Sequence, residues 1–145
     1  MIGLLQRVAW ARVEVDQANV AEIGCGLLVF IGVEHDDGSA QVQRLVQRLL
    51  NYRVFADAQG RMNLSVQDIK GGLLLVPQFT LPADTRKGNR PSFTPAAPPQ
   101  QGERLFNELL DQARQQHRPV AHGLFGANMQ VSLTNDGPVT FWLQV

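Results

Sequence analysis

The sequence has few of the side chains on which enzyme and metal sites are usually built. Its 145 residues include one cysteine, one tyrosine and three histidines. The lone Cys25 cannot form an internal disulfide, so a reducing cytoplasm is the expected location. Cys25 lies between two glycines before an apolar stretch, and no histidine is close in sequence to activate it. We therefore expect it to be small, buried filler.

An excess of one charge and long apolar runs are missing as well. The 13 basic and 13 acidic residues balance, whereas a protein that grips a long duplex carries a basic excess. DNA is therefore not expected as a partner, and no signal peptide or membrane-spanning run is recognisable. With 44% hydrophobic residues, the chain has enough core for a single domain over residues 1–145.

Familiar catalytic motifs are also absent. There is no Gly-x-Ser-x-Gly, no Walker loop, no dinucleotide-binding Gly-x-Gly-x-x-Gly, no His-Glu-x-x-His and no cysteine pair. His35 stands beside acidic residues, but no second histidine follows at ligand spacing, which favours a solvated loop over a metal site. An enzyme built from this chain would rely on backbone groups, hydroxyls and amides, which suits a fairly labile bond.

The hydrophobic pattern predicts several strands. Residues 2–15 read as a long strand, and shorter ones are expected at 20–23 and 52–55. The stretches 26–33 and 72–76 are almost wholly apolar, as in central strands that are covered on both faces.

Two amphipathic helices are predicted beside these strands. Ser39 is a plausible N-cap for the first, and the second runs over about 100–116. His117 follows the second helix, where the dipole favours it without any further role. The expected fold class is mixed α/β, with a twisted, barrel-like β core and the two helices packed outside.

Arg7 falls on a mostly apolar face of the first predicted strand, where a lone guanidinium is costly to bury. Two interpretations stay open. It is either a strand-end arginine that reaches solvent, or an arginine that donates to a fixed backbone carbonyl or a carboxylate.

The C-terminal stretch alternates between apolar and polar residues in two segments, 127–134 and 139–145. Asn135-Asp136-Gly137-Pro138 separates them. Asn-Asp-Gly alone would favour a tight hairpin turn, but Pro138 removes a donor just where the second strand should begin to pair. We predict two strands joined by a turn whose backbone shape serves a purpose.

The stretch 82–99 is irregular and holds five of the eight prolines. Loops of this length in compact domains are usually functional or disordered, and the prolines favour an ordered, stiff loop. Its basic residues Arg86, Lys87 and Arg90 are the best candidates for binding phosphate, with a merely solvated loop as the other interpretation.

Two places can supply reactive backbone and polar groups: the strand end Gln78-Phe79-Thr80 and the Gly137-Pro138 turn. Taken singly, Thr80 is an ordinary β-branched residue at a strand end, and Gln78 is an ordinary surface amide.

Together, these segments resemble the D-aminoacyl-tRNA deacylase family. The resemblance rests on Gln78-Phe79-Thr80-Leu81 and on residues 126–140, which contain Asn135-Asp136-Gly137-Pro138-Val139-Thr140. Further matching segments are Met1-Ile-x-Leu-x-Gln-Arg-Val, Gly26-Leu-Leu-Val, Tyr52-Arg53-x-Phe55, Met62-Asn63-Leu64 and Arg90-Pro91-Ser92-Phe93. They follow the family order and extend the likeness over essentially the whole chain.

The resemblance implies an enzyme that hydrolyses the ester between a D-amino acid and the terminal adenosine of tRNA, and that also clears glycine from mischarged tRNA. It implies a homodimer without a metal or organic cofactor. Gly137-Pro138, with a cis bond, would enter the other subunit's active site and reject L-amino acids. Gln78, Phe79 and Thr80 would hold the adenosine and the reacting carbonyl.

Further roles are implied for four residues. Arg7 would brace the Gly-Pro carbonyls, and Phe125, Ala127 and Met129 would support the site. A backbone N–H near Phe79 or Thr80 would stabilise the oxyanion, while the terminal ribose hydroxyl would position the attacking water.

One position departs from the family pattern, because Pro77 stands where a serine is usual. A serine nucleophile cannot operate here, and Thr80 has no base beside it in sequence to activate it. This favours a mechanism assisted by backbone and RNA. The alternatives are a non-catalytic dimer that binds tRNA ends and an esterase for small D-amino acid esters.

Overall fold

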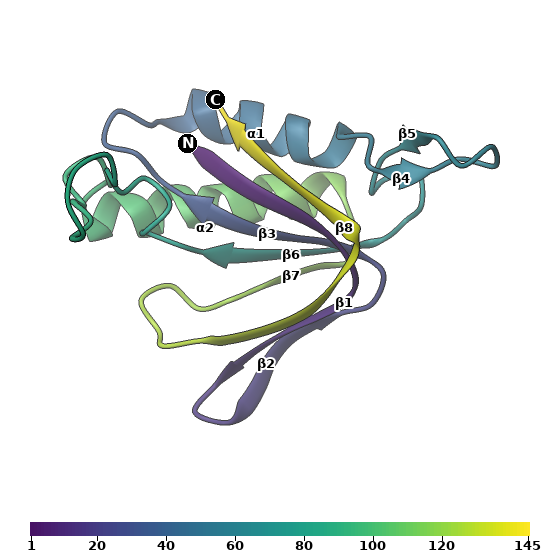
Figure 1. Cartoon of the computed structure of the whole chain (residues 1–145), viewed down its shortest axis with the longest axis horizontal. Helices are drawn as coiled ribbons and strands as arrows, with labels where there is room; N and C mark the ends of the chain where they lie inside the picture. The colour runs from purple at the N-terminus through teal and green to yellow at the C-terminus, as the bar shows by residue number, and fades with distance from the viewer.

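The computed structural model describes residues 1–145 as an α/β domain with one curled sheet and two helices (Figure 1). The sheet has the order β2-β1-β3-β6-β7, and β8 pairs with the other edge of β1. Its strands are β1 (Ile2–Val15), β2 (Ala18–Ile23), β3 (Gly26–Gly32), β6 (Gly72–Pro77), β7 (Val120–His122) and β8 (Gln130–Gln144). The remaining elements are α1 (Ser39–Asn51), α2 (Pro99–Gln116) and the two-stranded β4 (Phe55–Ala56) and β5 (Met62–Leu64). None of the helices is long and apolar enough to span a bilayer.

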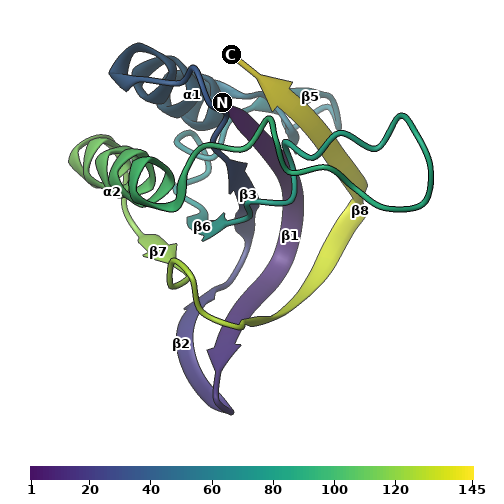
Figure 2. The same ribbon diagram turned by 90° about the vertical axis from the view of Figure 1, so that its left-hand side faces the viewer.

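The long strand β1 organises the sheet. One edge of β1 pairs first with β3 and then with β2, while the other edge pairs with β8. A two-residue turn joins β1 to β2, with positive φ at both Asp16 (49°) and Gln17 (67°), the pattern of a type I′ hairpin. Figure 2 shows the sheet curling from β8 through β1 to β6 and β7, which confirms the barrel-like core.

Both helices cover the same outer face of the sheet (Figures 1 and 2). They serve as crossovers between parallel strands, because β3 pairs parallel with β6 and β6 with β7. The predicted apolar stripes are the buried ones: Val42, Leu45, Val46, Leu49 and Leu50 on α1, and Leu105, Phe106, Leu109, Leu110 and Ala113 on α2. At roughly 2 kcal/mol for each fully buried large apolar side chain, this layer is a main source of stability.

A second, smaller core fills the inside of the curled sheet. Its members are Val8, Ala11, Val13, Ala21, Ile23, Leu28, Leu74 and Val76. Leu27 and Leu73 point into the helix-covered core, whereas their neighbours Leu28 and Leu74 point into this one. The two central strands are therefore apolar on both faces, as their sequences predicted.

The C-terminal stretch differs from its prediction. It forms one strand, β8, which pairs with β1 from Glu14↔Gln130 to Ile2↔Gln144. The predicted turn is instead a bulge in that strand. Gln6 of β1 pairs with Thr140 and Val8 pairs with Asn135, so Arg7 alone lies opposite residues 136–139 of β8. The residues before and after the bulge both pair with β1, so the chain continues in one direction instead of turning back. The strand also begins at Gln130 rather than at residue 127.

Local expectations near three element ends were wrong as well. Gly38, not Ser39, is the N-cap of α1, and its N–H donates to Gln41 Oε1 at 3.0 Å. Cys25 is exposed in a bend between β2 and β3 rather than buried. The strand expected at residues 52–55 shrinks to β4, because Tyr52 closes α1.

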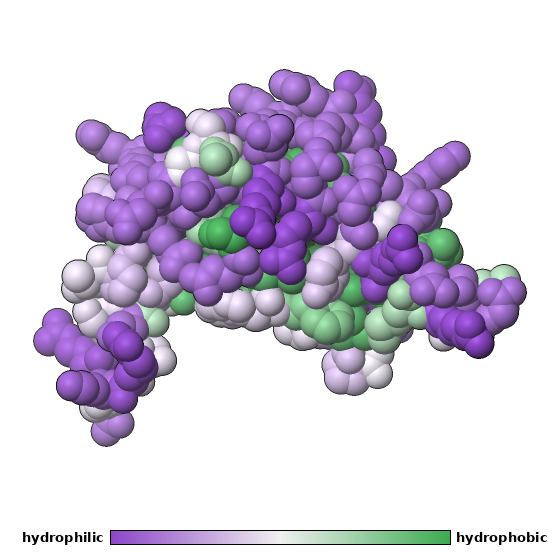
Figure 3. Space-filling model, turned by 90° about the horizontal axis from the view of Figure 1, so that it is seen from above, coloured by the Kyte–Doolittle hydropathy of each residue, from purple (hydrophilic) through white to green (hydrophobic).

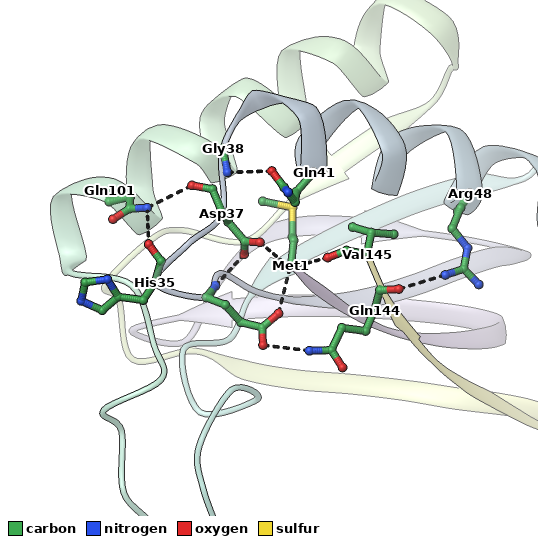
Figure 4. A network of polar contacts seen from close by, with 10 residues as sticks. Met1, His35, Asp37, Gly38, Gln41, Arg48, Gln101, Gln144 and Val145 are labelled. Atoms are coloured by element: carbon green, nitrogen blue, oxygen red, sulfur yellow. Dashed lines mark hydrogen bonds and ion pairs between the residues drawn. The ribbon is translucent and has the colours of Figure 1, made fainter.

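The two chain ends meet in a polar cluster beside α1 (Figure 4). The buried amino group of Met1 contacts Glu34 Oε2 at 2.9 Å, Asp37 Oδ1 at 2.5 Å and the backbone oxygen of Val145 at 3.2 Å. Gln144 Nε2 donates to Glu34 Oε1 at 2.8 Å. Burial alone would raise the pKa of Glu34, but the hydrogen bonds from Met1 and Gln144 hold that pKa below its ordinary value of 4.5.

This cluster predicts a pH dependence of stability. Because the folded-state pKa of Glu34 is depressed, its contribution is fully present above about pH 4.5 and is lost as the pH falls through the folded-state pKa. Glu34→Gln should lower the free energy of unfolding at neutral pH by about 1–3 kcal/mol and flatten its decline towards acid. Urea unfolding across this pH range measures both effects. The exposed Glu103 makes no ion pair, so Glu103→Gln should change neither, and identical curves for wild type and Glu34→Gln would refute the prediction.

Candidate active site

A cavity of about 680 Å³ opens at the carboxyl ends of the parallel strands β3 and β6, a common place for ligands in α/β folds. Its walls also come from the loop before α2, from the first turns of α2 and from the segment before β8. The lining is mostly apolar, and no carboxylate, cysteine, lysine or arginine belongs to it. The cavity therefore suits a ligand with a flat or apolar part, and His35 is the only ionisable side chain in its lining.

The strand end predicted to be reactive lies at this cavity. Pro77, Gln78 and Phe79 line it, and Thr80 follows directly. Gln78 N–H still donates to Ile31 O at 2.8 Å, after which the chain leaves the sheet. The N–H groups of Phe79 and Thr80 find no acceptor in the chain, whereas Gln78 Nε2 donates to Thr80 Oγ1 at 2.5 Å. Two free amide donors thus lie beside the cavity, on the segment that follows β6.

Two aromatic side chains, Phe79 and Phe93, line the cavity next to this strand end. The Phe79 side chain is 62% exposed, and its ring packs on Phe93 with centroids 5.3 Å apart. Phe93 belongs to the matched segment Arg90-Pro91-Ser92-Phe93, but the sequence pattern assigned it no role, because an aromatic in a proline-rich loop has no periodic partner. The tertiary structure makes it part of the cavity wall.

The predicted supporting residues lie on the segment before β8. Phe125, Ala127 and Met129 all line the cavity. The ring of Phe125 lies 6.5 Å from that of Phe106 on α2. The helix approaches closely here, since a Cβ added at Gly102 would lie 3.3 Å from Phe125 Cζ. The structure therefore brings five of the predicted residues together: Gln78, Phe79, Phe125, Ala127 and Met129.

Gly137, Pro138 and Arg7 do not line this cavity but form a second cluster at the β8 bulge. Arg7 Nε donates to Asp136 O at 2.9 Å and pairs with Asp136 Oδ2 at 3.2 Å, while Arg7 Nη1 donates to Val54 O at 2.7 Å. Of the two interpretations of Arg7, the one with a fixed carbonyl and a carboxylate is confirmed. The Gly137-Pro138 bond is cis, as the resemblance implied, and both residues are exposed.

The basic residues of the 82–99 loop line a separate hollow of about 380 Å³ together with Asp84 and Ser92. Backbone hydrogen bonds between Asp84 and Ser92 close the loop at 2.8 and 3.0 Å. Arg86 forms a two-pronged pair with Asp84, at 2.9 and 2.7 Å, and this side chain is the main cause that holds the pKa of Asp84 well below its ordinary value. Lys87 and Arg90 have no partner in the chain, so they are the cations available to a ligand.

The histidines supply no catalytic pair. His35 lines the cavity from an exposed loop, and no group of histidine, cysteine and acidic side chains is arranged to hold a metal ion. His117 is the C-cap of α2 as predicted, and its buried ring nitrogen Nε2 lies 2.7 Å from Gly71 O. It ties α2 to the residue before β6, at the opposite end of that strand from Pro77.

Comparisons with known proteins agree with this arrangement. The sequence model of the family described as D-Tyr-tRNA(Tyr) deacylase matches residues 4–144. A D-aminoacyl-tRNA deacylase of Alkalilimnicola ehrlichii is 63% identical over 144 residues, covering 99% of this chain and 96% of the relative. Another from Pseudomonas putida is 61% identical over 145 residues and covers 100% of both chains.

Solved structures share the fold. One described as a c-Myc DNA unwinding element binding protein superposes with a TM-score of 0.96 at 40% identity, covering 100% of this chain and 99% of the other. A probable eukaryotic D-amino acid tRNA deacylase superposes with a TM-score of 0.86 over 99% of this chain and 98% of the other, at 17% identity. With the family match over nearly the full length, the chain belongs to the D-aminoacyl-tRNA deacylase family of hydrolases.

Proposed function

We propose that this protein hydrolyses the ester of D-aminoacyl-tRNA and of glycyl-tRNA while it rejects L-aminoacyl-tRNA, releasing the free amino acid and tRNA. The observation that carries the proposal is the pair of free amides at Phe79 and Thr80, beside an apolar cavity whose lining holds no carboxylate, cysteine, lysine or arginine. Such a site is suited to hold a terminal nucleoside and to stabilise an oxyanion.

Catalysis in this proposal uses main chain and substrate rather than a protein nucleophile. The free N–H groups of Phe79 and Thr80 donate to the developing oxyanion when the ester carbonyl sits between them. Pro77 offers neither a hydroxyl nor an N–H, and Thr80 Oγ1 is already occupied by Gln78. Water positioned by the terminal ribose hydroxyl is the attacking group, so the protein contributes mainly orientation.

Chiral selection is assigned to Gly137 and Pro138 of the partner subunit. Selection by configuration, whatever the side chain, requires a fixed obstacle near the α-carbon, and main-chain carbonyls provide one. Two observations support this role. Both residues are exposed and lie outside their own chain's cavity, and Arg7 holds the neighbouring carbonyl of Asp136. An L side chain would meet the obstacle, a D side chain would point elsewhere, and glycine has none to reject.

A homodimer is part of the same proposal. The outer edge of β8 is unpaired. A long unpaired strand edge exposes backbone donors and acceptors, which proteins usually cover or block. Trp10, Phe141 and Trp142 on β1 and β8 are large apolar side chains with 38–50% exposure. Seen from above, the helix-covered surface is mostly hydrophilic, and hydrophobic patches appear along its lower edge (Figure 3). Burial of these side chains against a second copy would supply the association energy.

Lys87 and Arg90 are assigned to phosphates near the tRNA end, and the protein is placed in the cytoplasm, where aminoacyl-tRNA is found. The balanced charge supports an interaction with a few phosphates rather than along a duplex, so DNA is not proposed as a partner.

The direct test compares purified protein on D-tyrosyl-tRNA, glycyl-tRNA and L-tyrosyl-tRNA. We expect rapid release of D-tyrosine and glycine, with L-tyrosyl-tRNA left at its spontaneous rate, because only the L side chain meets the obstacle. Equal rates on the two tyrosyl substrates would contradict the proposal that the protein rejects L-aminoacyl-tRNA. Binding without release would favour a tRNA-end binding protein instead.

Gly137→Ala should weaken the preference for D over L by roughly tenfold or more, since a loss of about 1.4 kcal/mol in discrimination corresponds to a factor of ten. The new Cβ would lie 2.7 Å from Val139 Cγ2 and 3.0 Å from Arg7 Nη2, at a φ of +135°. Gly60→Ala is the matched control, because Gly60 also has a positive φ (+77°) but open space around it. Unchanged discrimination in Gly137→Ala would remove Gly137 from the filter.

Replacing both Lys87 and Arg90 by alanine should weaken binding of an RNA ending in D-aminoacyl-adenosine. The slope of log affinity against log salt should fall by roughly 0.7 for each phosphate that the protein no longer neutralises. Arg86→Ala should matter less, because Asp84 already occupies Arg86, and Arg114→Ala on α2 serves as the surface control. An unchanged rate and salt slope in the double variant would favour the esterase that needs no RNA.

A further inference from the structure

The bulge that carries Gly137-Pro138 is closed by the side chain of Asn135. Between the pairs Gln6↔Thr140 and Val8↔Asn135, the regular ladder of β8 with β1 is interrupted. The Asn135 carboxamide spans this gap. Its Oδ1 accepts from Val139 N–H at 2.7 Å, and its Nδ2 donates to Thr140 Oγ1 at 2.8 Å.

The hydroxyl of Thr140 extends this link to the neighbouring strand. Thr140 Oγ1 also accepts from Gln6 Nε2 at 3.3 Å, so Asn135 is connected through it to β1. A carboxamide suits this position because it offers an acceptor to the main chain and a donor to the hydroxyl at the same time. Local bonds from asparagine to nearby backbone groups are a common substitute for ladder bonds.

Asn135 and Arg7 hold opposite sides of the same dipeptide. Asp136, directly before Gly137, has its carbonyl bound by Arg7 at 2.9 Å. Val139, directly after Pro138, has its N–H bound by Asn135 and its side chain buried in the main core. The exposed dipeptide is thus anchored at both flanks although it lies outside any regular pairing.

We propose that Asn135 is a positioning residue that sets the placement of the Gly137 and Pro138 carbonyls and thereby the discrimination between D- and L-aminoacyl-tRNA. The inference rests on the proposed role of that dipeptide. A shift of about one ångström at an obstacle of this kind changes rejection strongly, because selectivity there depends on steric exclusion rather than on attraction.

The test measures kcat/KM on D-tyrosyl-tRNA and L-tyrosyl-tRNA for Asn135→Leu and Asn135→Asp. Leucine keeps the approximate size but cannot form either bond, and we expect the D-to-L ratio to fall by about tenfold or more. Aspartate keeps the acceptor for Val139 N–H, so its ratio should stay within about threefold of wild type. Destabilisation alone would lower both rates together and leave the ratio unchanged, so the ratio reports positioning.

Two further variants complete the design. Asn19→Leu makes the same change on β2, where the Asn19 side chain bonds only to the Glu22 side chain, and should leave the ratio unchanged. If Asn135→Leu does not fold, as judged by circular dichroism, Asn135→Ala replaces it with the same expected fall in the ratio.

The possible outcomes distinguish the positioning role of Asn135 from the proposed role of Gly137 and Pro138 in chiral selection. A wild-type ratio in folded Asn135→Leu, alongside a reduced ratio in Gly137→Ala, would overturn the positioning role and leave the filter standing. A ratio unmoved in both variants would overturn both. An equal fall in Asn135→Leu and Asn135→Asp would also overturn the inference, because the retained acceptor would then have no effect.

Discussion

The antiparallel pairing of β8 along almost the whole of β1 is the interaction on which the rest of the structure depends. It runs from Glu14↔Gln130 to Ile2↔Gln144 and places the last residues of the chain beside the first. The buried Met1 amine can therefore meet the end of the chain as well as Glu34 and Asp37. It also sets the interruption of β8 directly opposite Arg7, whose guanidinium donates to Asp136 O within the bulge and to Val54 O just before β4.

The functional groups divide between two places that one chain does not bring together. The cavity at the ends of β3 and β6 collects the free amides and the apolar walls, while the bulge on β8 presents Gly137 and Pro138 to solvent. In the proposed function, the active groups in both places are main-chain atoms. At the bulge, two side chains hold the main chain on either side of Gly137-Pro138. Arg7 donates to the Asp136 carbonyl, and Asn135 accepts from the Val139 N–H. This accounts for a sequence with few catalytic side chains.

Electrostatics plays a local role in a chain without net charge. Asp84 engages Arg86 and leaves Lys87 and Arg90 unpaired, so the loop keeps two available cations beside a closed turn. In the same way, the carboxylates beside Met1 are matched by the amino group rather than by a basic patch. Charge is thus arranged pair by pair, and overall composition says little about where a ligand would bind.

Periodicity in the sequence was enough to predict the apolar stripes of α1 and α2 and the two strands, β3 and β6, that are apolar on both faces. Its motifs were enough to indicate the family. It also raised a partnered Arg7 as one of two interpretations, since burial of an unpaired guanidinium is costly. Three features became visible only in the folded chain: β8 is one bulged strand, Cys25 is exposed and Phe93 lines the cavity. The reason is distance along the chain. Arg7 meets carbonyls 47 and 129 residues away, and no local pattern records which partner strand a segment will find.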